Sequence, residues 1–156
     1  MNQELFFFNY EHCFAFYSNL FSKIRQAIIN GEIIVAKPVL MLSIIDCIEE
    51  GIFDNNRFVL NDRLEQRYES LMKRYTKKSQ FDGFSPISNP FWHLATDGFW
   101  HLKLKGEAQK GITPSTKWLK ENVIYASFDD DLWILLQNKE WREKLREFII
   151  EKKLQG

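Results

Sequence analysis

The sequence predicts a mainly helical α+β fold in a single domain, residues 1–156, with a β-hairpin at its centre. The chain has 156 residues, a usual size for one domain, and 45% of them are hydrophobic. Apolar residues recur at helical spacing along most of it. Asp97-Gly98, between two aromatic runs, is typical of a two-residue hairpin turn.

The first two helices are expected at residues 10–28 and 39–50. The first should stop near Asn30-Gly31, before a short apolar run at 33–35. Pro38 fits the first turn of the second helix, and Gly51 ends that helix. Because the second helix is apolar almost all round, we expect it to be the most buried element.

A third, basic helix is expected after Asn61, which can cap it. A short strand is expected between residues 52 and 60, and a loop over 76–90. The apolar stripe of the helix is formed by Leu60, Leu64, Tyr68, Leu71, Met72 and Tyr75, and Arg63, Arg67 and Arg74 share its opposite face.

The central hairpin is expected from Pro90 to Leu102. A turn at Asp97-Gly98 would place one set of residues on the core face: Phe91, His93, Ala95, Trp100, Leu102 and Leu104. The other face would carry Trp92, Leu94, Thr96, Phe99, His101 and Lys103. Three helices followed by such a hairpin are, by analogy, winged-helix-like.

The last part of the chain predicts three more helices. Thr113 is expected to cap the first, with Pro114 at its first position, and this helix carries Trp118, Leu119 and Val123. The run 129–131 of three aspartates opens the second, and Asn138 caps the third.

Composition points to a cytoplasmic protein without a membrane span. Leu5-Phe6-Phe7-Phe8 is too short for a signal peptide, and no apolar run is long enough to cross a membrane. Cys13 and Cys47 lie among apolar residues, where buried, inert thiols are expected. The net charge is zero, but residues 63–120 carry 11 Lys and Arg against 5 Asp and Glu. This basic centre favours one positive face.

Catalytic motifs are missing from the sequence. The three histidines, His12, His93 and His101, do not cluster with other metal ligands, and the aspartates at 129–131 fit a helix dipole. No nucleophile motif, phosphate-binding loop or dinucleotide fingerprint occurs. We therefore expect no enzyme, no metal and no cofactor.

Aromatic and basic residues interleave around the expected hairpin: Phe84, Phe91, Trp92, Phe99 and Trp100 lie near Lys103, Lys105 and Lys110. Such a mixture suits nucleic acid, since cations meet phosphates and rings meet bases. The same rings could instead belong to the core, with lysines that only keep the surface soluble.

Two segments resemble a known family. They are Lys37-Pro38-Val39-Leu40-Met41-Leu42 and Asn89-Pro90-Phe91-Trp92-His93-Leu94, the latter followed by Asp97-Gly98-Phe99-Trp100. Their pairing and spacing, with Thr113-Pro114-Ser115 and the run 128–133, are similar to the sulfur-binding domain of phosphorothioate-dependent, McrA-type HNH restriction endonucleases. The resemblance covers roughly residues 35–150.

The resemblance implies recognition of double-stranded DNA in which a non-bridging phosphate oxygen is replaced by sulfur. An apolar pocket would be built from Pro90 and its neighbours up to His93, with Lys37 beside it. The implied DNA-binding residues are Lys37, Asn89, Pro90, Phe91, Trp92, His93, His101, Lys103 and Lys117, with Lys110 as an alternative to Lys117. The nuclease would be a further domain or subunit, since no HNH motif occurs here.

Two positions depart from the family's pattern. Ala36 stands where a histidine is usual, and Asn89 where an aromatic residue is common. These departures keep a second hypothesis open, a protein-interaction or structural module of a defence system that does not touch DNA. An undetected nuclease using His93 or His101 is a third. The sequence does not give the oligomeric state.

Overall fold

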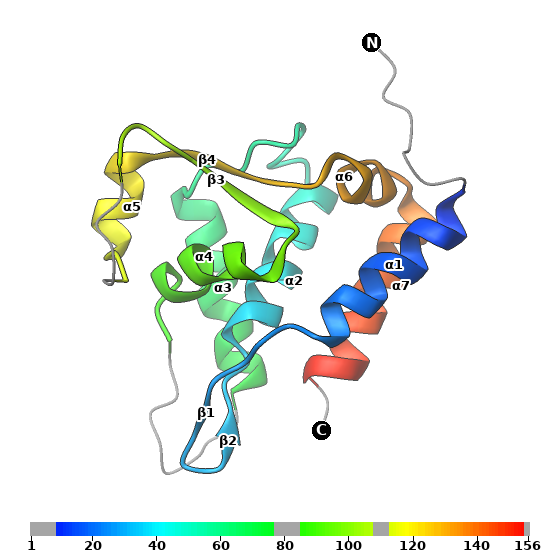
Figure 1. Ribbon diagram of the computed structural model, residues 1–156, viewed down its shortest axis with the longest axis horizontal. Helices are drawn as coiled ribbons and strands as arrows, with labels where there is room; N and C mark the ends of the chain where they lie inside the picture. Colours follow the sequence, from blue (N-terminus) through cyan, green and yellow to red (C-terminus); the bar gives the residue numbers. More distant parts are fainter. Residues whose placement is uncertain (1–8, 77–84, 108–112, 155–156) are drawn as a thin grey trace.

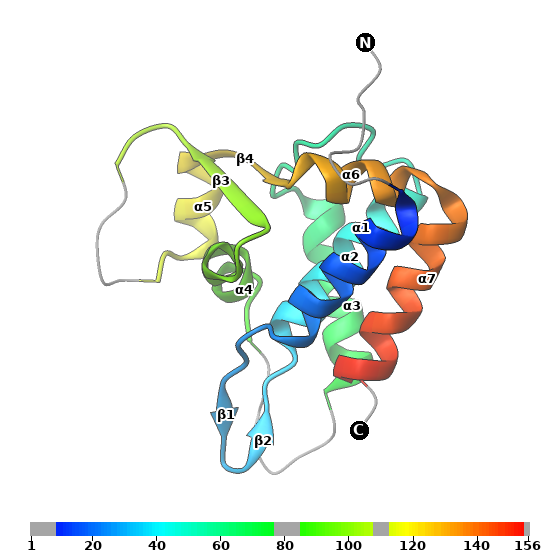
Figure 2. The same ribbon diagram turned by 45° about the vertical axis from the view of Figure 1, so that its right-hand side comes forward.

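Helices are the main regular structure of the protein, which we describe from a computed structural model over residues 9–76, 85–107 and 113–154. Helix α1 (Tyr10–Ser22) and helix α7 (Lys139–Ile149) lie side by side next to α2 (Ala36–Glu49) and α3 (Asp62–Tyr75), as Figures 1 and 2 show. Helix α6 (Asp130–Gln137) precedes α7, which continues into a π-helical segment, η2 (Ile150–Leu154). Leu5–Phe8, Lys77, Lys78, Phe84 and Lys110 lie outside the described residues.

Helix α2 is the central element, as its sequence predicts. Eleven of its 14 residues are buried. The helix begins three residues earlier than expected, at Ala36, so that Pro38 lies within its first turn. After its end, Gly51 adopts a positive φ of 78°, which permits the sharp change of direction.

The segment after α1 is a hairpin and not a helix, contrary to expectation. Helix α1 ends at Ser22, and β1 (Ile28–Ile29) pairs antiparallel with β2 (Glu32–Ile33). Asn30 and Gly31 both have positive φ, 53° and 79°, the conformation that a two-residue turn requires. The hairpin projects from the helices in both views (Figures 1 and 2).

The hairpin predicted from Pro90 to Leu102 is wrong. Residues Ser88–His93 form helix α4, Leu94–Asp97 form a 3₁₀ turn, η1, and Gly98 ends that turn with a φ of 95°. Positive φ serves a helix end as well as a hairpin, so the Asp-Gly pair alone does not decide between them. The predicted mainly helical α+β class is confirmed, whereas the winged helix stays an analogy.

Strand β3 (Trp100–Leu104) pairs with a strand that the sequence did not reveal, β4 (Val123–Phe128). Trp100 lies opposite Phe128, and His101 opposite Ser127. Val123 therefore begins a strand and does not end a helix. The strand expected between 52 and 60 is reduced to one bridge, Phe58 to Ala126.

Three predicted caps have different outcomes. Asn61 accepts a hydrogen bond from Leu64 N at the start of α3, and Asn138 accepts one from Trp141 N at the start of α7, as expected. Helix α5 (Thr116–Asn122) is capped by Ser115 and not by Thr113. Ser115 is the cap because its hydroxyl accepts a hydrogen bond from Trp118 N, three residues further along the chain.

The aromatic residues are mostly core. The rings of Phe58, Phe91, Phe99 and Trp100 are at most 1% exposed, and those of Phe91 and Trp100 meet edge-on with centroids 5.4 Å apart. The indole Nε1 of Trp100 donates a 2.8 Å hydrogen bond to the carbonyl oxygen of Phe91. This bond fixes the end of α4 against β3, because the last carbonyls of a helix have no partner within it.

No helix in the described ranges is long and apolar enough to cross a membrane. Both cysteines are buried and unpaired with each other, as predicted. Burial raises the pKa of Cys13 to about 12 and that of Cys47 to about 11, with smaller contributions from nearby carboxylates. Both are therefore protonated thiols at neutral pH.

Candidate functional site

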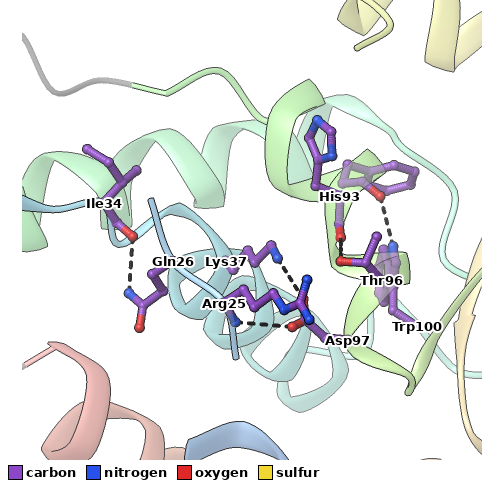
Figure 3. A network of polar contacts seen from close by, with 9 residues as sticks. Arg25, Gln26, Ile34, Lys37, His93, Thr96, Asp97 and Trp100 are labelled. Carbon is purple, nitrogen blue, oxygen red and sulfur yellow. Dashed lines mark hydrogen bonds and ion pairs between the residues drawn. The ribbon is translucent and has the colours of Figure 1, made fainter. Parts of the chain in front are cut away.

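A cavity of about 380 Å³ opens between the base of the β1–β2 hairpin, the start of α2 and helix α4. We call it the α2–α4 cavity. The lining comes from two segments far apart in the chain, residues 25–37 and 89–96, and Figure 3 shows part of it. Its lining consists of Arg25, Gln26, Ala27, Ile34, Ala36, Lys37, Asn89, Pro90, His93 and Thr96.

Apolar groups form one wall of this cavity. Ala36 is 4% exposed, Pro90 is buried and Ile34 is half-buried. The wall is held in place by the backbone, since Ile34 N donates to Ala27 O at 2.8 Å and closes the base of the hairpin. A poorly hydrated group can therefore rest on a preformed apolar surface here.

The positive end of α2 lies at the same cavity. Val35 occupies the N-cap position, and its side chain cannot accept a hydrogen bond, so no cap covers the first N–H groups of the helix. Ala36 and Lys37, the first helical residues, line the cavity. Uncapped N–H groups and the helix dipole together favour an anion at this end.

Asp97, at the end of η1, contacts both the segment after α1 and the start of α2 (Figure 3). Its Oδ2 is 2.7 Å from Nζ of Lys37, and its Oδ1 accepts a 3.1 Å hydrogen bond from the backbone N–H of Arg25. Both charged side chains are largely buried, with 14% of Lys37 and 6% of Asp97 exposed. Burial lowers the pKa of Lys153, and the charge of Asp97 opposes that shift, so a second cation besides Lys37 lies within the field of Asp97.

Arg25 is the cation of the cavity that remains available. The residue is exposed, and within the described ranges its guanidinium has no ion-pair partner. Lys37, in contrast, is engaged by Asp97. An anion at the cavity would therefore find an uncommitted guanidinium at its rim and a neutralised ammonium at its wall.

Of the nine predicted site residues, the structure brings four together in the cavity: Lys37, Asn89, Pro90 and His93. The ring of His93 is 2.7 Å from the hydroxyl of Thr113 through Nε2. Asn89 is exposed at the rim, and its amide donates to the hydroxyl of Ser85 at 3.0 Å. Their positions follow from α4, which presents Asn89, Pro90 and His93 on its cavity side.

Two further predicted residues are packed elsewhere. Phe91 is fully buried and belongs to the core, where its ring meets that of Trp100. Trp92 is half-buried and meets the ring of Trp118 edge-on, with centroids 6.0 Å apart. Neither lines the cavity.

The last three predicted residues lie away from the cavity. His101 is 2.6 Å from Oδ1 of Asp129, whose Oδ2 accepts a 2.8 Å bond from Tyr17. Lys103 is exposed on β3. Lys117 lines a separate cavity of about 590 Å³ between α3 and α5, together with Lys120 and three glutamates.

Sequence reasoning missed Arg25, Gln26, Ala27, Ile34 and Thr96 as cavity residues. Four of them flank the β1–β2 hairpin. Asn30-Gly31 between two apolar pairs was the signal that could have revealed that hairpin. In the part of the chain that the structure describes, no three His, Cys, Asp or Glu residues are grouped as metal ligands.

Comparison with known families gives a match that covers most of the chain. The family described as ScoMcrA-like, DNA sulfur-binding domain matches residues 21–156. No curated protein matches the chain.

Several solved structures share the fold. The sulfur binding domain of ScoMcrA complexed with phosphorothioated DNA has a TM-score of 0.66 and 19% identity, and the match covers 88% of this chain and 86% of that one. The corresponding domain of SprMcrA, also complexed with phosphorothioated DNA, has a TM-score of 0.62 and 15% identity over 92% and 86%. Against a two-domain fragment of ScoMcrA, its sulfur binding and SRA domains, the TM-score is 0.65 at 20% identity. There the match covers 86% of this chain but only 41% of that one.

Proposed function

Because the chain belongs to the ScoMcrA-like DNA sulfur-binding domain family, we propose that it recognises double-stranded DNA carrying a phosphorothioate. The observation that carries this proposal is the α2–α4 cavity, where an apolar wall and the uncapped end of a helix meet. The solved relatives with this fold include domains complexed with phosphorothioated DNA.

The apolar wall suits sulfur better than oxygen. Sulfur is larger, more polarisable and less strongly hydrated than a phosphate oxygen. Against Ala36 and Pro90 it gives up little hydration, whereas an oxygen loses hydrogen bonds to water without replacement. The difference between the two costs is the proposed source of selectivity. It does not require His at position 36 or an aromatic residue at position 89, where this chain has Ala36 and Asn89.

The rest of the modified phosphate would be held by the start of α2 and by Arg25. The N–H groups of Ala36 and Lys37 can donate to the remaining non-bridging oxygen. Arg25 can contact the same or the next phosphate. Asn89 and His93, at the rim, are the candidates for contacts to the flanking strand.

The proposal extends to the role of the whole chain. We propose that residues 1–156 form one reader domain that binds DNA in the cytoplasm without cleaving it, and that cleavage belongs to an HNH domain or subunit. The match covers 29% of the solved phosphorothioation-dependent restriction endonuclease ScoMcrA, so most of that enzyme lies outside the match.

Binding to paired duplexes tests the function. Two duplexes of one sequence, differing by one sulfur atom, are titrated by fluorescence anisotropy at fixed salt. The modified duplex should bind at least about tenfold more tightly, equal to about 1.4 kcal/mol. Pro90→Ser should reduce this ratio, because a hydroxyl on the wall hydrates the cavity.

The matched control is Pro86→Ser. Pro86 lines the α3–α5 cavity and lies four residues earlier, so the chemical change is the same at another place. It should leave the ratio unchanged. Equal binding of both duplexes by the unsubstituted protein would refute sulfur recognition and leave a general DNA-binding domain.

A protein-binding role is the second candidate, and the β1–β2 hairpin favours it. Ile28, Ile29 and Ile33 are 68%, 42% and 60% exposed, so the hairpin presents apolar surface to solvent. No binding of either duplex at low salt, together with a defined complex in solution, would support this role instead.

A further inference from the structure

We propose that Asp97 sets the sulfur-to-oxygen discrimination of the α2–α4 cavity by neutralising Lys37. This inference rests on the proposed function and adds a determinant of specificity that contacts a residue of the cavity lining. Asp97 itself does not line the cavity. It is a positioning residue, acting on DNA through Lys37.

The geometry holds the carboxylate of Asp97 in one place. One oxygen accepts from Nζ of Lys37 at 2.7 Å, and the other from the backbone N–H of Arg25 at 3.1 Å. Turning the carboxylate toward solvent would break both contacts and expose a side chain that is only 6% accessible. The pair between Lys37 and Asp97 is therefore part of the built site, unlike an exposed ion pair.

The chemistry of the ammonium explains why this pairing affects selectivity. An unpaired ammonium is a compact, strongly hydrated cation that binds a compact, strongly hydrated phosphate oxygen well. Sulfur, with its diffuse charge, gains less from such a donor. While Asp97 occupies the ammonium, an unmodified phosphate that enters the cavity loses water and gains no cation from Lys37.

Removing the charge of Asp97 should therefore strengthen the binding of unmodified DNA. Asp97→Asn keeps an oxygen that can accept from Arg25 N–H, but it no longer neutralises Lys37. Nζ of Lys37 can then turn to a phosphate oxygen at the cavity that it lines. One charge-assisted hydrogen bond corresponds to about a tenfold change in affinity.

The experiment measures both duplexes with Asp97→Asn over a range of salt concentrations. We expect unmodified duplex to bind about tenfold more tightly and modified duplex no more than about threefold more tightly, so the ratio between them falls at least about threefold. The salt dependence for unmodified duplex should steepen by about 0.9 in log K against log salt, the value of one added phosphate contact. A mutation that merely loosened the fold would weaken both.

A second variant tests whether the effect passes through Lys37. Lys37→Met alone leaves a carboxylate without its cation near the phosphate, so both duplexes should bind more weakly. Combining it with Asp97→Asn makes the site neutral again and should restore both affinities toward their original values. This rescue also serves if Asp97→Asn alone fails to fold, because the double variant has no buried unpaired charge.

The charge-matched control is Asp54→Asn. It changes the net charge of the protein by the same amount, but Asp54 is exposed and follows the other end of α2. A helix of 14 residues spans about 21 Å, so the lost charge is far from the cavity and screened by salt. It should leave the ratio and the salt slope unchanged.

Three outcomes decide the proposal. If the unsubstituted protein prefers the modified duplex but Asp97→Asn leaves the ratio unchanged, Asp97 does not set it, and the proposed function stands. The role of the pair would also be overturned if the double variant did not regain the DNA affinity that Lys37→Met loses. If the unsubstituted protein binds both duplexes equally, the proposed function fails, and this inference fails with it.

Discussion

Trp100→Phe is the change that should most directly test how α4 is held against the β3–β4 sheet. The indole of Trp100 is 1% exposed and donates to the carbonyl of Phe91 at 2.8 Å. Phenylalanine keeps an aromatic ring there but removes the donor. A buried carbonyl without a partner costs about 1–3 kcal/mol.

The lost ring contacts add to this cost. Trp100 packs against Phe58, Phe91 and Phe128, with centroids between 5.4 and 6.0 Å apart. The smaller ring fills less of that space, which adds about 1 kcal/mol. We therefore expect the free energy of unfolding to fall by about 2–4 kcal/mol.

Urea denaturation, followed by tryptophan fluorescence and by circular dichroism, measures this loss. Trp92→Phe is the matched control, because its half-buried ring meets only the edge of Trp118 in the described aromatic contacts. That change should cost about 1 kcal/mol or less. A loss below about 1 kcal/mol for Trp100→Phe would show that the bond to Phe91 does not anchor α4.

Two substitutions and one change of pH test other parts of the structure. Tyr17→Phe removes the bond to Asp129 and should lower the unfolding free energy by about 1–2 kcal/mol in urea denaturation, whereas no change would show that the contact is dispensable. Gly98→Ala places a side chain at a φ of 95° and should cost about 1–3 kcal/mol by the same measurement, and a neutral result would contradict the strained backbone. Because burial raises the pKa of Cys13 to about 12 and of Cys47 to about 11 from 9.0, the unfolded chain loses these protons first, so stability should decline as pH rises above 9. Both thiols should resist a thiol reagent at pH 8 in the folded protein, and rapid reaction there would refute their burial.

Long periodic helices and their caps were predictable from sequence, because local rules determine them. The apolar surround of α2 and the caps Asn61 and Asn138 are examples. Strand pairing was not predictable. About 20 residues of sequence separate β3 from β4, and the local sequence of a strand does not indicate which strand it pairs with. For Gly98, the sequence indicates a positive φ but does not indicate whether the residue lies in a hairpin turn or at the end of a helical turn.

The candidate site was also predictable only in part. Lys37 and Pro90 were identified through a resemblance that spans two motifs, and the structure brings both to one cavity. Arg25 was not identified, because its role depends on the hairpin that follows it. The engagement of Lys37 by Asp97 could not be foreseen either, since it joins residues 60 positions apart.

Helix α1 shows that the boundary of a family match need not be the boundary of a folding unit. The match begins at residue 21, yet Cys13 and Tyr17, which precede it in α1, are at most 2% exposed. The ring of Tyr17 packs against that of Phe21, with centroids 6.4 Å apart, and Phe21 in turn meets Phe99 at 4.9 Å, directly beside the strand that anchors α4. A protein shortened to the matched residues would open this side of the core to water. For gene dissection or crystallography, the useful unit therefore begins before α1.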